Sequence, residues 1–223
     1  MLCISKYFYM DTSKEHLDQL AHIRTMMERS TRFISLSGLS GIFAGIFALI
    51  GAAVAVVYLK LGFPYSEYWI TPNANLTSRL AIMKFFIVDA SMVLIASIVV
   101  STLLTVKRAN QNGQQIWNVA AKRLFINMAI PLLTGGLFCL IAYYRYGYIG
   151  MIAPLMLIFY GLALLNASKY TLDDVRYLAL AEIVLGLFAF YKIGYGLLFW
   201  TIGFGVLHIV YGAWMWNKYE RNS

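Results

Sequence analysis

Long runs of hydrophobic residues alternate with short polar segments along most of the chain. A helix that crosses a bilayer needs about 20 mostly apolar residues. Six runs meet or approach that length, at 33–60, 79–106, 122–143, 148–168, 175–193 and 195–217. The breaks between them are short and contain glycine, proline, asparagine or aspartate, which favour turns. The pattern predicts an all-α polytopic membrane bundle with six transmembrane helices.

The segment before the first run is more polar, and its spacing predicts a cytoplasmic amphipathic helix that begins near Ser13. Glu15, Asp18 and His22 share one face of this helix. We interpret that face as solvated and predict no metal site, because a fourth ligand is missing. The chain is predicted to be a single integral membrane domain over 1–223, with an N-terminal segment at 1–32, a bundle at 33–217 and a cytoplasmic tail at 218–223.

Charge is scarce in this sequence and unevenly placed. Only 13% of the residues are charged and 61% are hydrophobic, whereas soluble domains carry about a quarter charged residues. This composition excludes an ordinary water-soluble protein. The net charge is +8, yet thirteen of the 18 Lys and Arg residues lie in the N-terminal segment, in or beside the second and fourth loops, and in the tail. By the positive-inside rule both termini are predicted to be cytoplasmic. The lipid bilayer is therefore the expected partner, and nucleic acid is not.

The last two hairpins share sequence features at a regular spacing. The run from Gly136 to Phe138 recurs as Gly186 to Phe188, and the run from Ile158 to Gly161 recurs as Ile209 to Gly212. A two-helix unit returns the chain to the same side of the membrane, so its repetition keeps the orientation. The spacing predicts a tandem hairpin repeat.

Three stretches carry a resemblance to known proteins. They are the runs at 26–41, 160–171 and 196–212, which read MMERSTRFISLSGLSG, YGLALLNASKYT and GLLFWTIGFGVLHIVYG. In these stretches the chain resembles uncharacterised six-helix membrane proteins of Bacteroidota, and its glycine-rich hairpins are more faintly similar to HdeD-type acid-stress membrane proteins. The resemblance implies a bacterial inner (cytoplasmic) membrane location and no assigned activity.

Three ionisable residues fall well inside the predicted spans, namely Asp89, Glu182 and His208. A charge at such depth costs a few kcal/mol even on lenient scales, so these residues are candidate functional groups that face the bundle interior. Glu182 and His208 are predicted at matching depth on adjacent helices, where a hydrogen bond between them is sterically feasible. The sequence leaves two interpretations open. The residues form a polar centre that binds protons, or a neutral pair locks two helices together.

Small and amide residues indicate helix packing. Gly41 and Gly45 lie in one row of small residues, and Gly205 and Gly212 flank His208. Such rows allow close approach of helices, either within the chain, which we favour, or in a homo-oligomer. Asn127 and Asn166 are expected to form hydrogen bonds between helices.

Familiar catalytic and cofactor-binding motifs are missing from the sequence, so catalytic residues are unknown and no cofactor is expected. Three classes of function remain open. The first is a small transporter or channel-like protein with a proton-linked polar centre, for an unknown small molecule or ion. The second is a non-catalytic membrane assembly or stress-response factor, and the third is an intramembrane lipid or metal-dependent enzyme.

Overall fold

The structure is a computed structural model that describes residues 19, 32–33, 37–61, 76–111, 113 and 116–221. The predicted N-terminal amphipathic helix, with Glu15, Asp18 and His22, lies outside these residues. All regular secondary structure in the described part is helical. The elements are α2 (Gly38–Leu59), α3 (Leu76–Gln111), α4 (Val119–Tyr146), η1 (Ile149–Met151), α5 (Ile152–Ala167), η2 (Ser168–Tyr170), α6 (Val175–Tyr191), α7 (Gly196–Trp200), η3 (Thr201–Leu207) and α8 (His208–Tyr219).

The all-helical fold expected from the sequence is confirmed. Five described stretches are helical, long and apolar enough to cross a membrane: Gly38–Leu59, Leu80–Gln111, Val119–Tyr146, Ile149–Tyr170 and Gly196–Tyr219. The fifth predicted span, 175–193, corresponds to α6, which has 17 residues. The last stretch combines α7, η3 and α8, and its middle part, η3, is a π-helix.

The first helix begins later than the sequence predicts. Helix α2 begins at Gly38 rather than near residue 33. Phe33 is instead held by the segment after α5, because its amide donates to the carbonyl of Tyr170 at 2.8 Å and its carbonyl accepts from Thr171 Oγ1 at 2.6 Å. Hydropathy does not indicate such a contact between distant segments. The apolar run at 33–60 therefore extends further toward the N-terminus than α2 does.

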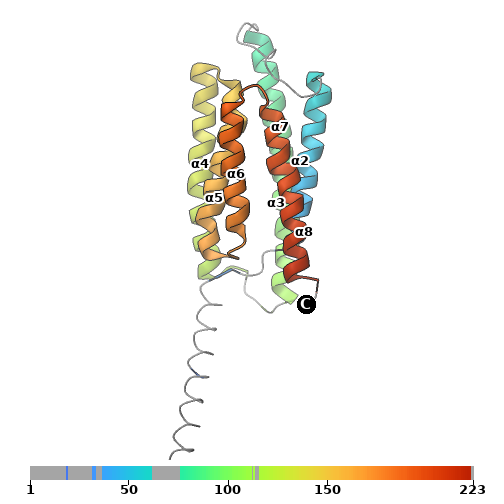
Figure 1. The fold of residues 1–223 in the computed structure, drawn as a ribbon, viewed down its shortest axis with the longest axis vertical. Coiled ribbons are helices and arrows are strands. Elements are labelled where there is room, and N and C mark those ends of the chain that lie inside the picture. Colours follow the sequence, from blue (N-terminus) through green and yellow to red (C-terminus); the bar gives the residue numbers. More distant parts are fainter. Residues whose placement is uncertain are drawn as a thin grey trace, which may run out of the picture.

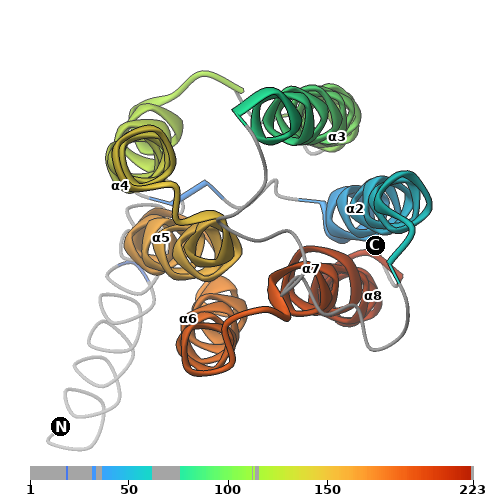
Figure 2. The same ribbon diagram turned by 90° about the horizontal axis from the view of Figure 1, so that it is seen from above.

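The helices are nearly parallel to one common axis (Figure 1). Viewed along that axis they follow an open arc in the order α3, α2, α7–α8, α6, α5 and α4 (Figure 2). Helix α2 packs on α3 and on α8, while α5 packs on α4 and on α6. Helix α7 and segment η3 connect these two groups through their contacts with α5 and α2. Helices α3 and α4 do not pack extensively on each other over the described residues.

Glycines bring α2 and α8 into backbone contact. A Cβ atom built on Gly45 would lie 2.6 Å from the carbonyl oxygen of Gly205, and one on Gly41 would lie 3.2 Å from Cα of Gly212. A Cβ on Gly212 would lie 2.6 Å from the amide nitrogen of Ile42. The four glycines singled out in the sequence therefore pack against one another within one chain. A homo-oligomer that uses such faces stays a prediction.

An amide side chain compensates for a proline inside α4. Pro131 has no N–H, so the carbonyl of Asn127, four residues earlier, loses its usual helical donor. Asn166 of α5 donates to that carbonyl at 3.0 Å, and its side-chain nitrogen also lies 3.4 Å from Asn127 Oδ1. Because lipid offers no donor, a carbonyl in a span must be satisfied by the protein. The hydrogen bonds expected between Asn127 and Asn166 are thus present and have a specific structural reason.

Charged groups join the helices at the end that holds the C-terminus. Glu220 accepts hydrogen bonds from the amide of Gly38 and from Ser37 Oγ, and it forms an ion pair with Arg108 at 2.8 Å. A carboxylate at the start of α2 also complements the positive end of the helix dipole. The C-terminal end of α8 is thereby tied to the beginning of α2 and the end of α3.

A second polar contact at this end involves Asp174, which directly precedes α6. Its carboxylate accepts from Lys218 Nζ and from Tyr219 Oη, both at 2.6 Å. Burial opposes ionisation of this carboxyl, but the two hydrogen bonds and the positive charge of Lys218 outweigh it and hold the pKa of Asp174 below its ordinary value. The contact therefore favours a charged Asp174.

Candidate functional site

Glu182 occupies the middle of α6 and is completely buried, with 0% of its surface exposed. Its side chain crosses to the π-helical segment η3, where a glycine leaves space for it. A Cβ atom built on Gly203 would lie 2.6 Å from Glu182 Oε2, and it would also meet the side chain of Leu157. The position of the carboxyl group therefore depends on having no side chain at residue 203.

His208 is the first residue of α8 and is also buried. Its Nδ1 atom lies 3.4 Å from Glu182 Oε1, which is within ion-pair distance but does not meet the geometry of a hydrogen bond. The same nitrogen lies 3.0 Å from the carbonyl oxygen of Gly203, and the other ring nitrogen, Nε2, lies 2.7 Å from Tyr160 Oη. The structure thus brings Glu182 and His208 together, although the imidazole forms its hydrogen bonds with other groups.

The hydrogen-bond partners determine the tautomer of a neutral His208. A carbonyl oxygen only accepts hydrogen bonds, so Nδ1 must carry the proton and donate to Gly203. Nε2 then has a free lone pair and accepts from the hydroxyl of Tyr160. A second proton on the ring would therefore bind at Nε2, on the side that faces Tyr160.

Three oxygen atoms in this region have no hydrogen-bond partner among the described residues: Glu182 Oε1, Glu182 Oε2 and Tyr211 Oη. Tyr160 lies close enough to both Glu182 and Tyr211 to interact with them electrostatically. Glu182, His208, Tyr160 and Tyr211 form what we call the polar cluster, which joins α5, α6 and α8. Because a buried charge is costly without a partner, a change of protonation in this cluster would act directly on the packing of these helices.

The two tyrosines of the polar cluster were not among the candidate site residues in the sequence. A tyrosine in an apolar helix is usually an ordinary packing residue, so Tyr160 carries no local signal. One signal did exist, because Tyr160 and Tyr211 occupy equivalent positions in the repeated Ile-x-Tyr-Gly motif. In the structure both tyrosines pack against the same buried cluster, which includes Leu164 and Ala179.

Asp89 lies elsewhere in the bundle. Its carboxylate lies beside Gly51 of α2, where a built Cβ atom would be 3.3 Å from Oδ2. Within the described residues Asp89 makes no contact with Glu182 or His208, and it forms no hydrogen bond or ion pair. The three ionisable residues therefore form two separate sites. The reason is the direction in which α3 faces: it packs along α2, whereas the polar cluster lies between α5, α6 and α8.

Asp89 lines a cavity of about 250 Å³. Its walls come from α2, α3, α4, α5, α7 and η1, and most of the side chains that line it are apolar. Cys139 of α4, which is a free buried thiol, also lines this cavity. Among the described residues no three His, Cys, Asp or Glu side chains are grouped so that they could hold a metal ion.

Comparisons with protein families, with curated proteins and with solved structures find no match to this chain. The inference of function therefore depends on the geometry of the polar cluster and of the cavity.

Proposed function

We propose that this protein is a small proton-linked transporter of the bacterial inner membrane with six transmembrane helices. Helix α6, with 17 residues, completes the set of six spans. At 1.5 Å per residue it is about 26 Å long, at the lower end of what crosses a bilayer. The resemblance to six-helix proteins of Bacteroidota supports this assignment, as does the tandem hairpin repeat, whose two equivalent tyrosines both belong to the polar cluster.

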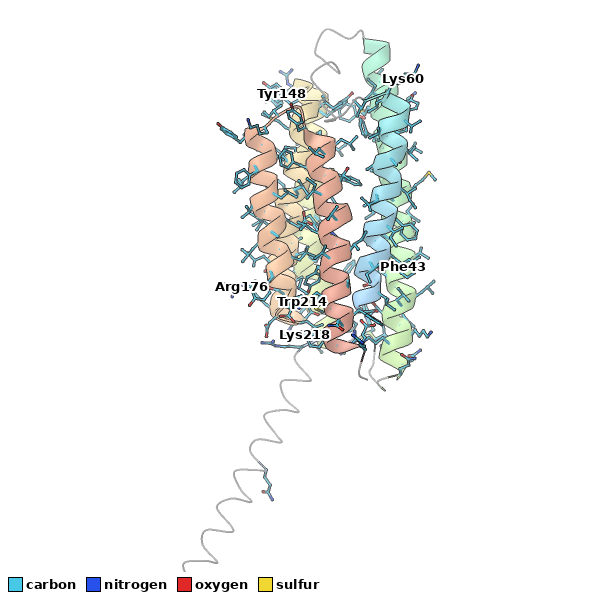
Figure 3. All side chains as sticks on the ribbon, turned by 45° about the vertical axis from the view of Figure 1, so that its right-hand side comes forward. Phe43, Lys60, Tyr148, Arg176, Trp214 and Lys218 are labelled. Atoms are coloured by element: carbon cyan, nitrogen blue, oxygen red, sulfur yellow. The ribbon has the colours of Figure 1, made fainter. Side chains whose placement is uncertain are left out.

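Both termini are proposed to be cytoplasmic. Arg176 and Lys218 lie at the end of the bundle that holds the C-terminus, and Lys60 lies at the opposite end with Tyr148 (Figure 3). Other basic residues of the same end include Arg108, Lys122 and Arg123, which belong to the connection between α3 and α4. This excess of positive charge on one side is what the positive-inside rule associates with the cytoplasm.

The observation that carries the proposal is the approach of Glu182 Oε1 to His208 Nδ1 at 3.4 Å inside the membrane domain. When the two groups together carry one titratable proton the pair is neutral overall, either as a carboxylic acid beside a neutral imidazole or as a carboxylate beside an imidazolium. Adding a second titratable proton leaves a net positive charge, and removing the first leaves a net negative charge. Either net charge is costly while the site is closed.

This cost links proton binding to helix movement. Water or a counter-charge can offset a net charge on the pair only if α6, α8 or α5 moves apart from the others. The titratable group that contacts the pair is Tyr160, which also interacts with Tyr211, and Asp174 interacts with Tyr211 from the end of the bundle. The proposed cycle therefore alternates between a closed state with one proton and an open state in which the pair exchanges protons.

Proton flux into proteoliposomes tests the proposal. The protein is reconstituted with a pH-sensitive dye inside the vesicles, and uptake is driven by a potassium-diffusion potential. Glu182→Gln and His208→Ala are expected to reduce the flux to that of protein-free vesicles and to remove its pH dependence. Asp173→Asn is the matched control, because its carboxylate is exposed and pairs with Arg32. Wild-type flux and pH dependence in both cluster variants would refute the proposal.

A non-catalytic assembly or stress-response factor is the second candidate. It is favoured by the dense glycine contact between α2 and α8, which indicates a rigid bundle. It predicts a stable protein partner that co-purifies in mild detergent, together with no proton flux. The third class, an intramembrane lipid or metal-dependent enzyme, stays a prediction from the sequence, since no observation here favours it.

A further inference from the structure

The cavity beside Asp89 is separate from the polar cluster and has a defined chemistry. Of the described residues that line it, Asp89 alone carries a formal charge. Most of the remaining wall is apolar, with Ala52 on α2, Ala153 on α5 and the indole of Trp200 on α7. A carboxylate in such surroundings attracts a hydrogen-bond donor with positive charge, and intramembrane acids commonly act as counter-ions of ligands.

The lining of this cavity determines which kind of ligand it can hold. Helices α3 and α4 both line it, but they do not pack extensively on each other over the described residues. Figure 2 shows them at the two ends of the arc. Because the lining is mostly apolar apart from Asp89, the cavity favours an amphipathic molecule over a small hydrophilic cation.

The volume limits the size of the ligand. A cavity of about 150 Å³ accepts benzene, which has six non-hydrogen atoms. In proportion, the cavity of about 250 Å³ accepts about ten such atoms. We propose that this cavity is a binding site for small lipophilic amines, in which Asp89 binds the ammonium group and the apolar walls hold the hydrocarbon part.

Two residues of the cavity give independent variants. Asp89→Asn keeps the shape of the side chain and removes its charge. Gly136→Leu fills the cavity without disturbing the helix, because a Cβ atom at Gly136 meets no atom within 4 Å. Leu137→Phe is the matched control, since residue 137 follows directly on the same helix but is 61% exposed.

The probe is radiolabelled 3-phenylpropylamine, which has ten non-hydrogen atoms and is protonated at neutral pH. Saturable binding is measured to the full chain in lipid nanodiscs, with 3-phenylpropanol as the neutral isostere in competition. The amine is expected to bind roughly tenfold more tightly than the alcohol, because only the ammonium group can form a charge-assisted hydrogen bond with the carboxylate. Asp89→Asn should remove this preference while the alcohol still binds, which also shows that the variant is folded.

Gly136→Leu should abolish binding of both compounds, and Leu137→Phe should leave both unchanged. Equal affinity for amine and alcohol in the wild-type protein would overturn the proposal, as would an amine preference that survives Asp89→Asn. A lipid that is retained by the purified protein, blocks the amine and is lost in Gly136→Leu would also overturn it, because the occupant would then be an acyl chain.

Discussion

The close contact between α2 and α8 leads to a quantitative prediction for Gly45→Ala. The new methyl group would lie 2.6 Å from the carbonyl oxygen of Gly205 and 3.0 Å from the amide nitrogen of Ile209. Carbon atoms in good packing are about 3.5 to 4.0 Å apart, so these distances are too short. Both obstructing atoms belong to the backbone, and relief requires α2 to move away from α8.

The expected magnitude follows from two opposing terms. Alanine is favoured over glycine within a helix by roughly 0.5–1 kcal/mol. Overpacking of a close contact costs about 1–3 kcal/mol, and a backbone obstruction places Gly45→Ala in the upper part of that range. Gly136→Ala gains the same helix preference, but its methyl group meets no atom within 4 Å. The difference in unfolding free energy between the two variants therefore isolates the packing term, and we expect it to be about 2–3 kcal/mol.

Both variants can be unfolded reversibly in mixed micelles by increasing the fraction of a denaturing detergent, with loss of helix followed by circular dichroism. Gly45→Ala should unfold at a lower detergent fraction than the wild-type protein, and Gly136→Ala at an equal or higher fraction. Equal midpoints for the two variants would refute the reasoning, because they would show that α2 and α8 are not in backbone contact at Gly45.

Two further predictions concern single polar contacts. Asn166→Ala should lower the unfolding free energy by about 1–2 kcal/mol by leaving the carbonyl of Asn127 without a donor, and Pro131→Ala in the same chain should restore most of this loss, as a double-mutant cycle would measure. Asp174 contributes to the unfolding free energy because its pKa is lower in the folded protein than its ordinary value, although burial opposes this shift. This contribution is fully present above the ordinary aspartate pKa and is lost as the pH falls through the lowered value. Unfolding curves over an acidic pH series should therefore show less loss of stability in Asp174→Asn than in the wild-type protein, and parallel curves would contradict the role of the contact with Lys218.

Much of the fold could be predicted from the sequence because bilayer thickness limits helix length. Apolar runs near that length identify the spans without any knowledge of tertiary contacts. Depth was also predictable from residue position along each helix, and so was the proximity of Glu182 and His208, since short connections keep consecutive helices adjacent. The start of α2 at Gly38 was not predictable, because the hydrogen bonds of Phe33 with Tyr170 and Thr171 hold the preceding segment away from the helix.

The rotation of each helix about its own axis was the missing information for the site. All faces of a membrane span are apolar, so the hydrophobic pattern does not indicate which side faces the neighbours. The depth of Asp89 along its helix is compatible with a common polar centre with Glu182. The rotation of α3 about its axis, however, places Asp89 beside Gly51 and the cavity. The apolar pattern also gave no sign of the π-helix before His208, which contains Gly203, the glycine that lies against Glu182.

The two acids inside the bundle differ in what can reach them, and this difference assigns them different ligands. Glu182 is completely buried and lies against Gly203 of η3, so a proton is the ligand that reaches it with the least rearrangement of the helices. Asp89 borders a cavity with room for about ten non-hydrogen atoms. Segment η3 and helix α7 are continuous in the chain, and they contact the polar cluster through Gly203 and the cavity through Trp200. A movement of this segment on proton exchange would therefore change the cavity wall, which is the physical connection that coupling of the two sites requires.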